Sequence, residues 1–147
     1  MGETLTYRGQ CHCGAIRLTL ELTKPAEEID VRACQCGFCV RHGGMTVSDP
    51  NGKAFFDIDR RRLDGYRFAT KSGTVLVCRT CGVYAGMILE AEGRVWSVAN
   101  VRGLAVPEFR NAKPRAVVYD EETREQRIAR RSRMWTPTEI RLHDAWP

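Results

Sequence analysis

Short runs of alternating apolar and polar residues dominate the first 120 residues of the chain. The clearest run covers residues 15–22, and its alternation is typical of a strand with one buried face. Glycine, proline, aspartate and asparagine gather between such runs and indicate turns. Further strands are predicted at residues 54–58, 73–78, 83–89, 94–99 and 116–119.

Only two segments have helical character. Residues 34–44 predict a short helical turn, whereas residues 121–133 are rich in helix formers but offer little apolar face. The second segment is expected to be either a surface helix or a mobile excursion. The pattern therefore predicts a mainly β fold of antiparallel sheets with long loops and little helix. We expect one domain over residues 1–147, with residues 116–147 as a C-terminal extension that packs on the domain or extends from it.

Composition agrees with a folded protein that has its own core. The chain has 147 residues, and 43% of them are hydrophobic, which is enough to bury a core of ordinary size. It contains no apolar run long enough to cross a membrane. Residues 1–10 lack the apolar centre of a secretory signal, so a cytoplasmic location is expected.

Cysteine is the most informative residue type, because seven cysteines cannot all pair within one monomer. A reducing cytoplasm also disfavours disulfides, whereas thiolates bind zinc without needing an even number. The cysteines fall into three groups: Cys11 and Cys13; Cys34, Cys36 and Cys39; and Cys78 and Cys81.

The grouping predicts two zinc sites of different kinds. The first and third groups each supply two thiolates and each ends in a glycine, so together they provide a closed, tetrahedral structural site. The middle group then holds three thiolates alone. Three protein ligands with a free fourth position are typical of a catalytic zinc.

Other uses of the cysteines stay open at this point. Several could be buried without metal, or all seven could share one structural cluster. His42 could close the second site as a fourth ligand. Cys78 and Cys81 could form a thioredoxin-like pair, although no clear helix pattern follows them.

The positive charge of the chain does not by itself indicate a nucleic-acid partner. The formal net charge is +5, but seven thiolates with two Zn²⁺ ions would lower it to roughly +2. The C-terminal arginines are interleaved with acids, which argues against a phosphate-binding groove. These acids are Asp120, Glu121, Glu122 and Glu125.

The three cysteine motifs resemble those of the glutathione-dependent formaldehyde-activating enzyme family, which also includes centromere protein V. The motifs are Gly9-x-Cys11-His12-Cys13-Gly14, Cys34-x-Cys36-x-x-Cys39 and Cys78-x-x-Cys81-Gly82, and their order and spacing both fit. The resemblance covers about residues 4–115.

The resemblance implies an Mss4-like, zinc-containing β fold and an enzymatic role. It gives Cys11, Cys13, Cys78 and Cys81 the structural zinc and Cys34, Cys36 and Cys39 the catalytic zinc. The implied reaction joins glutathione and formaldehyde as S-hydroxymethylglutathione, a carbon–sulfur lyase type of chemistry. A small-molecule thiol and an aldehyde are then the expected partners.

Polar residues near the middle group are candidates for assisting that chemistry. Asn100 or His42 could donate a hydrogen bond to the developing alkoxide, and Arg41 and Arg102 could offset the negative charge of three thiolates. The alternative function is a non-catalytic zinc module that contacts a protein or a nucleic acid. The sequence leaves the oligomeric state, the direction of the reaction and the role of the arginine-rich segment open.

Overall fold

The computed structural model describes residues 3–144, and strands are their main regular structure, as the alternating pattern predicted. The two helices are α1 (Gly37–His42) and α2 (Arg124–Met134), and single 3₁₀ turns lie at Ala26–Glu28, Arg60–Arg62 and Pro107–Phe109. The strands are β1 (Leu5–Gln10), β2 (Ile16–Leu22), β3 (Arg32–Cys34), β4 (Thr46–Val47), β5 (Lys53–Asp59), β6 (Leu63–Tyr66), β7 (Thr74–Cys78), β8 (Tyr84–Ala91), β9 (Arg94–Asn100), β10 (Arg115–Val117) and β11 (Thr136–His143).

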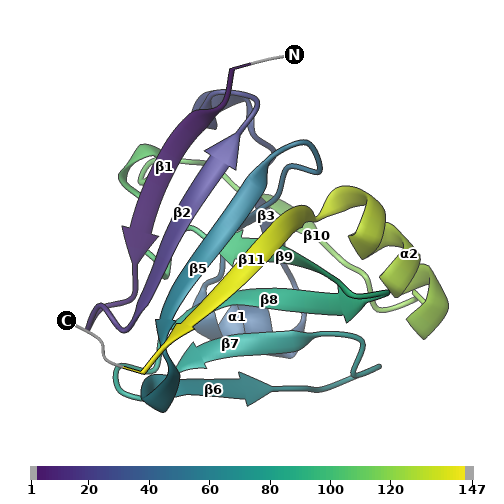
Figure 1. Cartoon of the computed structure of the whole chain (residues 1–147). Coiled ribbons are helices and arrows are strands. Elements are labelled where there is room, and N and C mark those ends of the chain that lie inside the picture. The colour runs from purple at the N-terminus through teal and green to yellow at the C-terminus, as the bar shows by residue number, and fades with distance from the viewer. Residues whose placement is uncertain (1–2, 145–147) are drawn as a thin grey trace.

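The strands form two layers that share one strand. β1, β2, β5 and β11 lie side by side in one layer, and in the other β9 and β8 run behind β11 with β7 and β6 below them (Figure 1). The second layer continues from β9 through β4 and β3 to β10. The start of β11 pairs with β9, and the rest of β11 pairs with β5, so this strand joins the layers.

Most strand pairs are antiparallel, which confirms the predicted fold class. Two pairs are parallel: β3 with β10, and β5 with β11. Both bring together segments far apart in the sequence, which a local pattern of polar and apolar residues does not predict.

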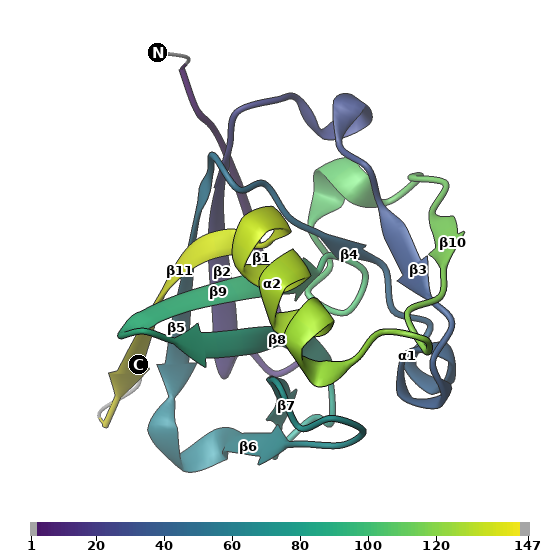
Figure 2. The same ribbon diagram turned by 90° about the vertical axis from the view of Figure 1, so that its right-hand side faces the viewer.

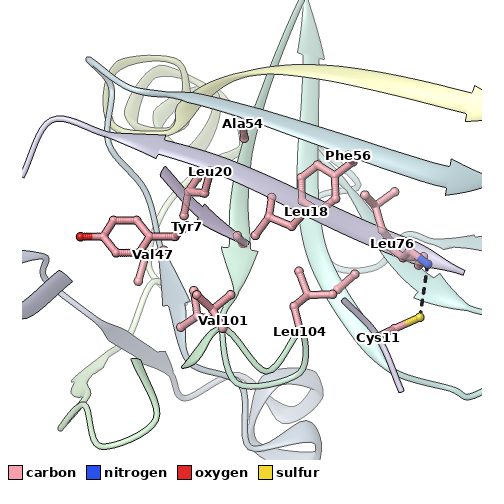
Figure 3. Close-up of a cluster of buried hydrophobic side chains, with 14 of the residues drawn as sticks. Tyr7, Cys11, Leu18, Leu20, Val47, Ala54, Phe56, Leu76, Val101 and Leu104 are labelled. Atoms are coloured by element: carbon pink, nitrogen blue, oxygen red, sulfur yellow. Dashed lines mark hydrogen bonds between the residues drawn. The ribbon is translucent and has the colours of Figure 1, made fainter. Parts of the chain in front are cut away.

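A single large core fills the space between the layers. Figure 3 shows Leu18 and Leu20 of β2 and Phe56 of β5 pointing toward Val101 and Leu104 in the loop after β9. All five side chains are almost completely buried. Burying a side chain of this size contributes roughly 1.5–3 kcal/mol, so this core accounts for much of the stability.

The C-terminal part of the chain differs from its prediction in detail. The strand expected at residues 116–119 ends at Val117, because β10 pairs with only three residues of β3 and Val118 is exposed. The helix expected at residues 121–133 is present at Arg124–Met134. A capping box starts it, since Thr123 accepts from the Gln126 amide and the Gln126 side chain accepts from the Thr123 amide.

α2 lies across β8 and β9 on one side of the molecule, and α1 lies beside β3 and β10 (Figure 2). Ile128 of α2 packs against a small second cluster that includes Trp96 and Trp135. This contact holds a helix that otherwise carries mostly charged residues. No helix among residues 3–144 has the length and apolar character needed to cross a membrane.

Candidate functional site

The first and third cysteine groups meet in one four-cysteine cluster. Cys11 and Cys13 lie in the turn between β1 and β2, whereas Cys78 ends β7 and Cys81 lies in the turn that leads to β8. Their four sulfur atoms all lie within 4.8 Å of one another. The Cys11–Cys13 and Cys13–Cys78 sulfur distances are 3.8 and 3.4 Å. Four sulfurs at about 2.3 Å from one zinc ion would be roughly 3.8 Å apart, so the cluster fits zinc.

Backbone amides of both turns point at the sulfurs. The Ile16 amide donates to Cys11 Sγ at 3.3 Å, and the Cys81 amide donates to Cys78 Sγ at 3.4 Å. Such bonds stabilise thiolates, which are the form that binds metal. The turns close through left-handed glycines, at Gly14 (φ +84°) and Gly82 (φ +79°).

The four-cysteine cluster is fixed to the core. Cys11 and Cys78 are each only 1% exposed and pack in the large core. Burial raises the pKa of Cys11 and raises the pKa of Cys78 to about 12. Burial acts to raise the pKa of Cys81, but backbone hydrogen bonds outweigh it together with those from Cys78 and Cys11, and the pKa is lowered to about 6. Without metal, the cluster would therefore hold fewer than four thiolates at neutral pH, and metal binding would release the remaining protons.

The middle group forms a separate three-cysteine cluster around the start of α1. Cys34 ends β3, Cys36 is the residue that caps α1, and Cys39 lies within the helix. The Cys39 amide donates to Cys36 Sγ at 3.4 Å, and the three sulfur atoms lie within 4.8 Å of one another. All three cysteines are partly exposed. Among the described residues, no fourth histidine, cysteine or acidic ligand joins this cluster.

The thiols of Cys34 and Cys39 have pKa values shifted in opposite directions. A hydrogen bond from Cys39 lowers the pKa of Cys34 to about 6, although burial opposes this. The same hydrogen bond, together with burial, raises the pKa of Cys39. Cys34 is therefore a thiolate at neutral pH even before metal binds, and it provides a first anionic ligand.

A cavity of about 350 Å³ opens on the three-cysteine cluster, and Cys34, Cys36 and Cys39 form part of its wall. The other walls come from β3, β4, β8, β9, the loop after β6, the segment 117–122, Trp135 and the arginine-rich helix α2. The four cysteines of the other cluster are not among the residues that line it. The two clusters thus differ in access as well as in the number of ligands.

Tyr84 is a residue of this site that the sequence did not reveal. Its side chain is buried at the cavity wall, and Phe38 packs edge-on against its ring at 5.1 Å. Burial, followed by the charge of Cys39, raises the pKa of Tyr84 well above its usual value. Tyr84 is therefore a neutral hydrogen-bond donor beside the sulfurs. Its sequence signal was only that of a strand residue, because its place at the cavity depends on how β8 pairs with its neighbours.

The two predicted polar residues lie in different surroundings. Asn100 is buried, where its Oδ1 accepts from the Met45 amide at 3.0 Å and its Nδ2 donates to the Tyr84 carbonyl at 2.8 Å. Asn100 thus fixes the backbone of Tyr84, and its role as an alkoxide donor stays a prediction. His42 is exposed and stacks on Phe38 at 4.5 Å, and it is not among the residues that line the cavity.

The cations near the cysteines are not those expected. Arg41 and Arg102 are exposed, donate to nearby carbonyls and do not line the cavity. The arginines that line it come from β3 and α2, namely Arg32, Arg127, Arg130 and Arg131. The sequence showed that α2 is arginine-rich but not that it covers the cysteines, because that contact is formed by tertiary packing alone.

Comparison with known proteins agrees with the cysteine pattern. A protein-family model described as glutathione-dependent formaldehyde-activating enzyme matches residues 6–122. A comparison with curated proteins finds no match. Among solved structures, a Rhodobacter sphaeroides protein determined as a structural genomics target has a TM-score of 0.59 and 27% sequence identity. The similarity covers 75% of this chain and 99% of that one.

Proposed function

The chain belongs to the glutathione-dependent formaldehyde-activating enzyme family, and on that premise we propose that it forms or breaks an S-hydroxymethyl adduct between a thiol and formaldehyde. The proposed class is a carbon–sulfur lyase. The observation that carries the proposal is the three-cysteine cluster, whose sulfurs lie together at the wall of a cavity and leave a tetrahedral metal one position short.

We propose zinc at both clusters. Sulfur-only donors in groups of four and three favour zinc over magnesium or calcium, which prefer oxygen ligands. Cys11, Cys13, Cys78 and Cys81 would hold a structural ion, and Cys34, Cys36 and Cys39 would hold a second one. An ion at the second cluster would supply an open position that favours the thiolate form of a substrate thiol at neutral pH.

The reaction itself needs few groups from the protein. The thiolate sulfur attacks the aldehyde carbon, the carbonyl electron pair moves to oxygen, and the oxygen takes up the proton that the thiol lost. The neutral hydroxyl of Tyr84 is placed at the cavity wall, where it can donate a hydrogen bond to that oxygen as its charge develops. Asn100 supports Tyr84 through its backbone. His42 remains a second candidate donor, from outside the cavity wall.

Exchange measurements test the proposal directly. NMR exchange spectroscopy on the formaldehyde adduct of glutathione measures how fast it forms and breaks, with and without the zinc-loaded protein. We expect acceleration by the protein and none by the Cys36→Ser variant at equal concentration. No acceleration with several thiols would instead favour a non-catalytic zinc module.

A further inference from the structure

A buried arginine of α2 faces the cavity without a carboxylate partner. Arg131 is 8% exposed and lines the cavity. Its Nη1 donates to Ser72 Oγ at 3.2 Å, and its guanidinium lies over the ring of Trp135 at 4.6 Å. Its Nε has no hydrogen-bond partner, and among the described residues no acidic group lies within ion-pair distance of it.

Two of the four arginines that line the cavity, Arg131 and Arg32, have no carboxylate partner among the described residues. Glu122 is already engaged, since Arg130 donates to it at 2.7 Å and Arg127 lies 3.6 Å from it. Arg32 donates to the Ser48 hydroxyl at 2.6 Å, whereas Arg131 keeps an Nε without any hydrogen-bond partner. Burying a charged group without a partner is costly, so an unpaired guanidinium held in place is a feature of a binding site.

The Arg131 guanidinium stays charged in its buried place. Burial, Arg130 and Arg127 lower the pKa of Arg131 to about 10, which is still well above neutral pH. Ser72 and Trp135 hold the group, so little side-chain entropy would be lost when it binds an anion.

Tyr84 links this cation to the cysteines. It lies close enough to interact electrostatically with both Arg131 and Cys39, and all three residues line the same cavity. One small molecule can therefore contact the cysteine wall with its sulfur and the α2 wall with another group.

We propose that Arg131 and Trp135 form the subsite that binds a carboxylate of the thiol handled at the three-cysteine cluster. The planar guanidinium matches a carboxylate through charge and paired hydrogen bonds, and it already lies at the cavity wall. Formaldehyde has no ionisable group, so the carboxylate belongs to the thiol. This inference rests on the proposed function for the identity of the reacting sulfur. The subsite itself lies in residues 131–135, beyond the matched family region of residues 6–122.

The test compares two thiols that differ in one group, 3-mercaptopropionate and its uncharged amide. Calorimetric binding to the zinc-loaded protein should give a dissociation constant about tenfold or more lower for the acid, as expected for a buried charged hydrogen bond. Arg131→Met should remove this preference by weakening the acid and leaving the amide unchanged. Arg133→Met is the matched control, because it removes the same charge from an exposed position of α2.

Each outcome bears on the subsite separately from the reaction. Equal binding of acid and amide to the unchanged protein overturns the inference, whatever the variants do. A preference that survives in a folded Arg131→Met variant also overturns it and leaves Arg131 a structural residue. If adduct exchange is not accelerated but the Arg131-dependent preference is present, the subsite stands and the proposed reaction fails. If the protein accelerates adduct exchange but does not prefer the acid over the amide, the proposed reaction stands and the subsite fails.

Discussion

The two cysteine clusters use the same ligand atom in opposite surroundings. The four-cysteine cluster joins two turns that lie about 65 residues apart, with Cys11 and Cys78 buried in the core. The three-cysteine cluster is built by one short segment, and its partly exposed sulfurs form a cavity wall. In the first cluster a metal would hold the fold together. In the second, the fold already holds the ligands, so a metal there would be free to act on another molecule.

The largest expected effect is the loss of the fold in Cys78→Ser. A structural zinc contributes on the order of 10 kcal/mol to folding, which is as much as the whole stability of many small domains. We expect an unfolded or aggregated protein, to be checked by far-ultraviolet circular dichroism and by zinc content. A folded variant that still binds two zinc ions per chain would contradict the role given to this cluster.

Cys36→Ser should affect function but not folding. Cys36 is partly exposed and lies at a short helix outside the large core, so its loss leaves the core intact. We expect zinc content to fall from two ions to one, adduct exchange to fall to the uncatalysed rate, and the melting temperature to change by only a few degrees. If this variant unfolds as fully as Cys78→Ser, the distinction between the clusters is wrong.

Stepwise removal of metal should separate the clusters without mutation. The three-cysteine cluster is reached from the cavity and lacks a fourth protein ligand, so a weak chelator should take its ion first. We expect loss of the first ion with unchanged circular dichroism, and loss of the second ion together with unfolding. Release of both ions in a single step would show that the clusters are equally accessible.

The smallest expected effect concerns α2, which covers only the three-cysteine side. Hydrogen bonding from Arg130 lowers the pKa of Glu122, although burial opposes this. The carboxylate therefore stabilises the fold above its unfolded pKa of about 4.3, and this stabilisation is lost as pH falls through the lower, folded value.

Glu122→Gln should thus reduce the free energy of unfolding by up to about 1 kcal/mol at pH 7. The difference from the unchanged protein should shrink below about pH 4, where Glu122 is protonated in both states. Urea unfolding of both proteins at several pH values measures this difference in the free energy of unfolding. Comparing the variant with the unchanged protein at the same pH removes the contribution of metal release. A difference that grows in acid would contradict the assigned pairing.

The sequence predicted what is encoded locally. The alternation in residues 15–22 predicted β2, and the spacing of the cysteines predicted which sulfurs lie together. It missed the short strands β3, β4 and β6, and it missed β1 and β11. Of the side chains of β1 only that of Tyr7 is buried, and Pro137 interrupts the start of β11. Such strands are defined by their pairing partners rather than by their own pattern.

The cavity could not be predicted from local sequence patterns, because its walls come from segments far apart in the chain. Tyr84 and Arg131 lie 47 positions apart in the sequence, and they line the same cavity because α2 packs across β8. The arginines predicted from the sequence, Arg41 and Arg102, do not line the cavity. Each donates instead to a nearby backbone carbonyl. The cysteine motifs identified the candidate ligands, whereas only tertiary packing identified what surrounds them.

The sharing of β11 between the two layers has a consequence for the growing chain on the ribosome. β5 pairs with β2 on one side, and its other side can be paired only after β11 has been synthesised. Arg141 of β11 forms an ion pair with Asp57 of β5, 84 residues earlier in the chain. Until residue 143 emerges, the nascent polypeptide presents an open β5 edge and an incomplete core, which favours pairing with other chains. Cotranslational folding of this protein must therefore finish late, and chain shortening before β11 should yield insoluble product rather than a smaller native unit.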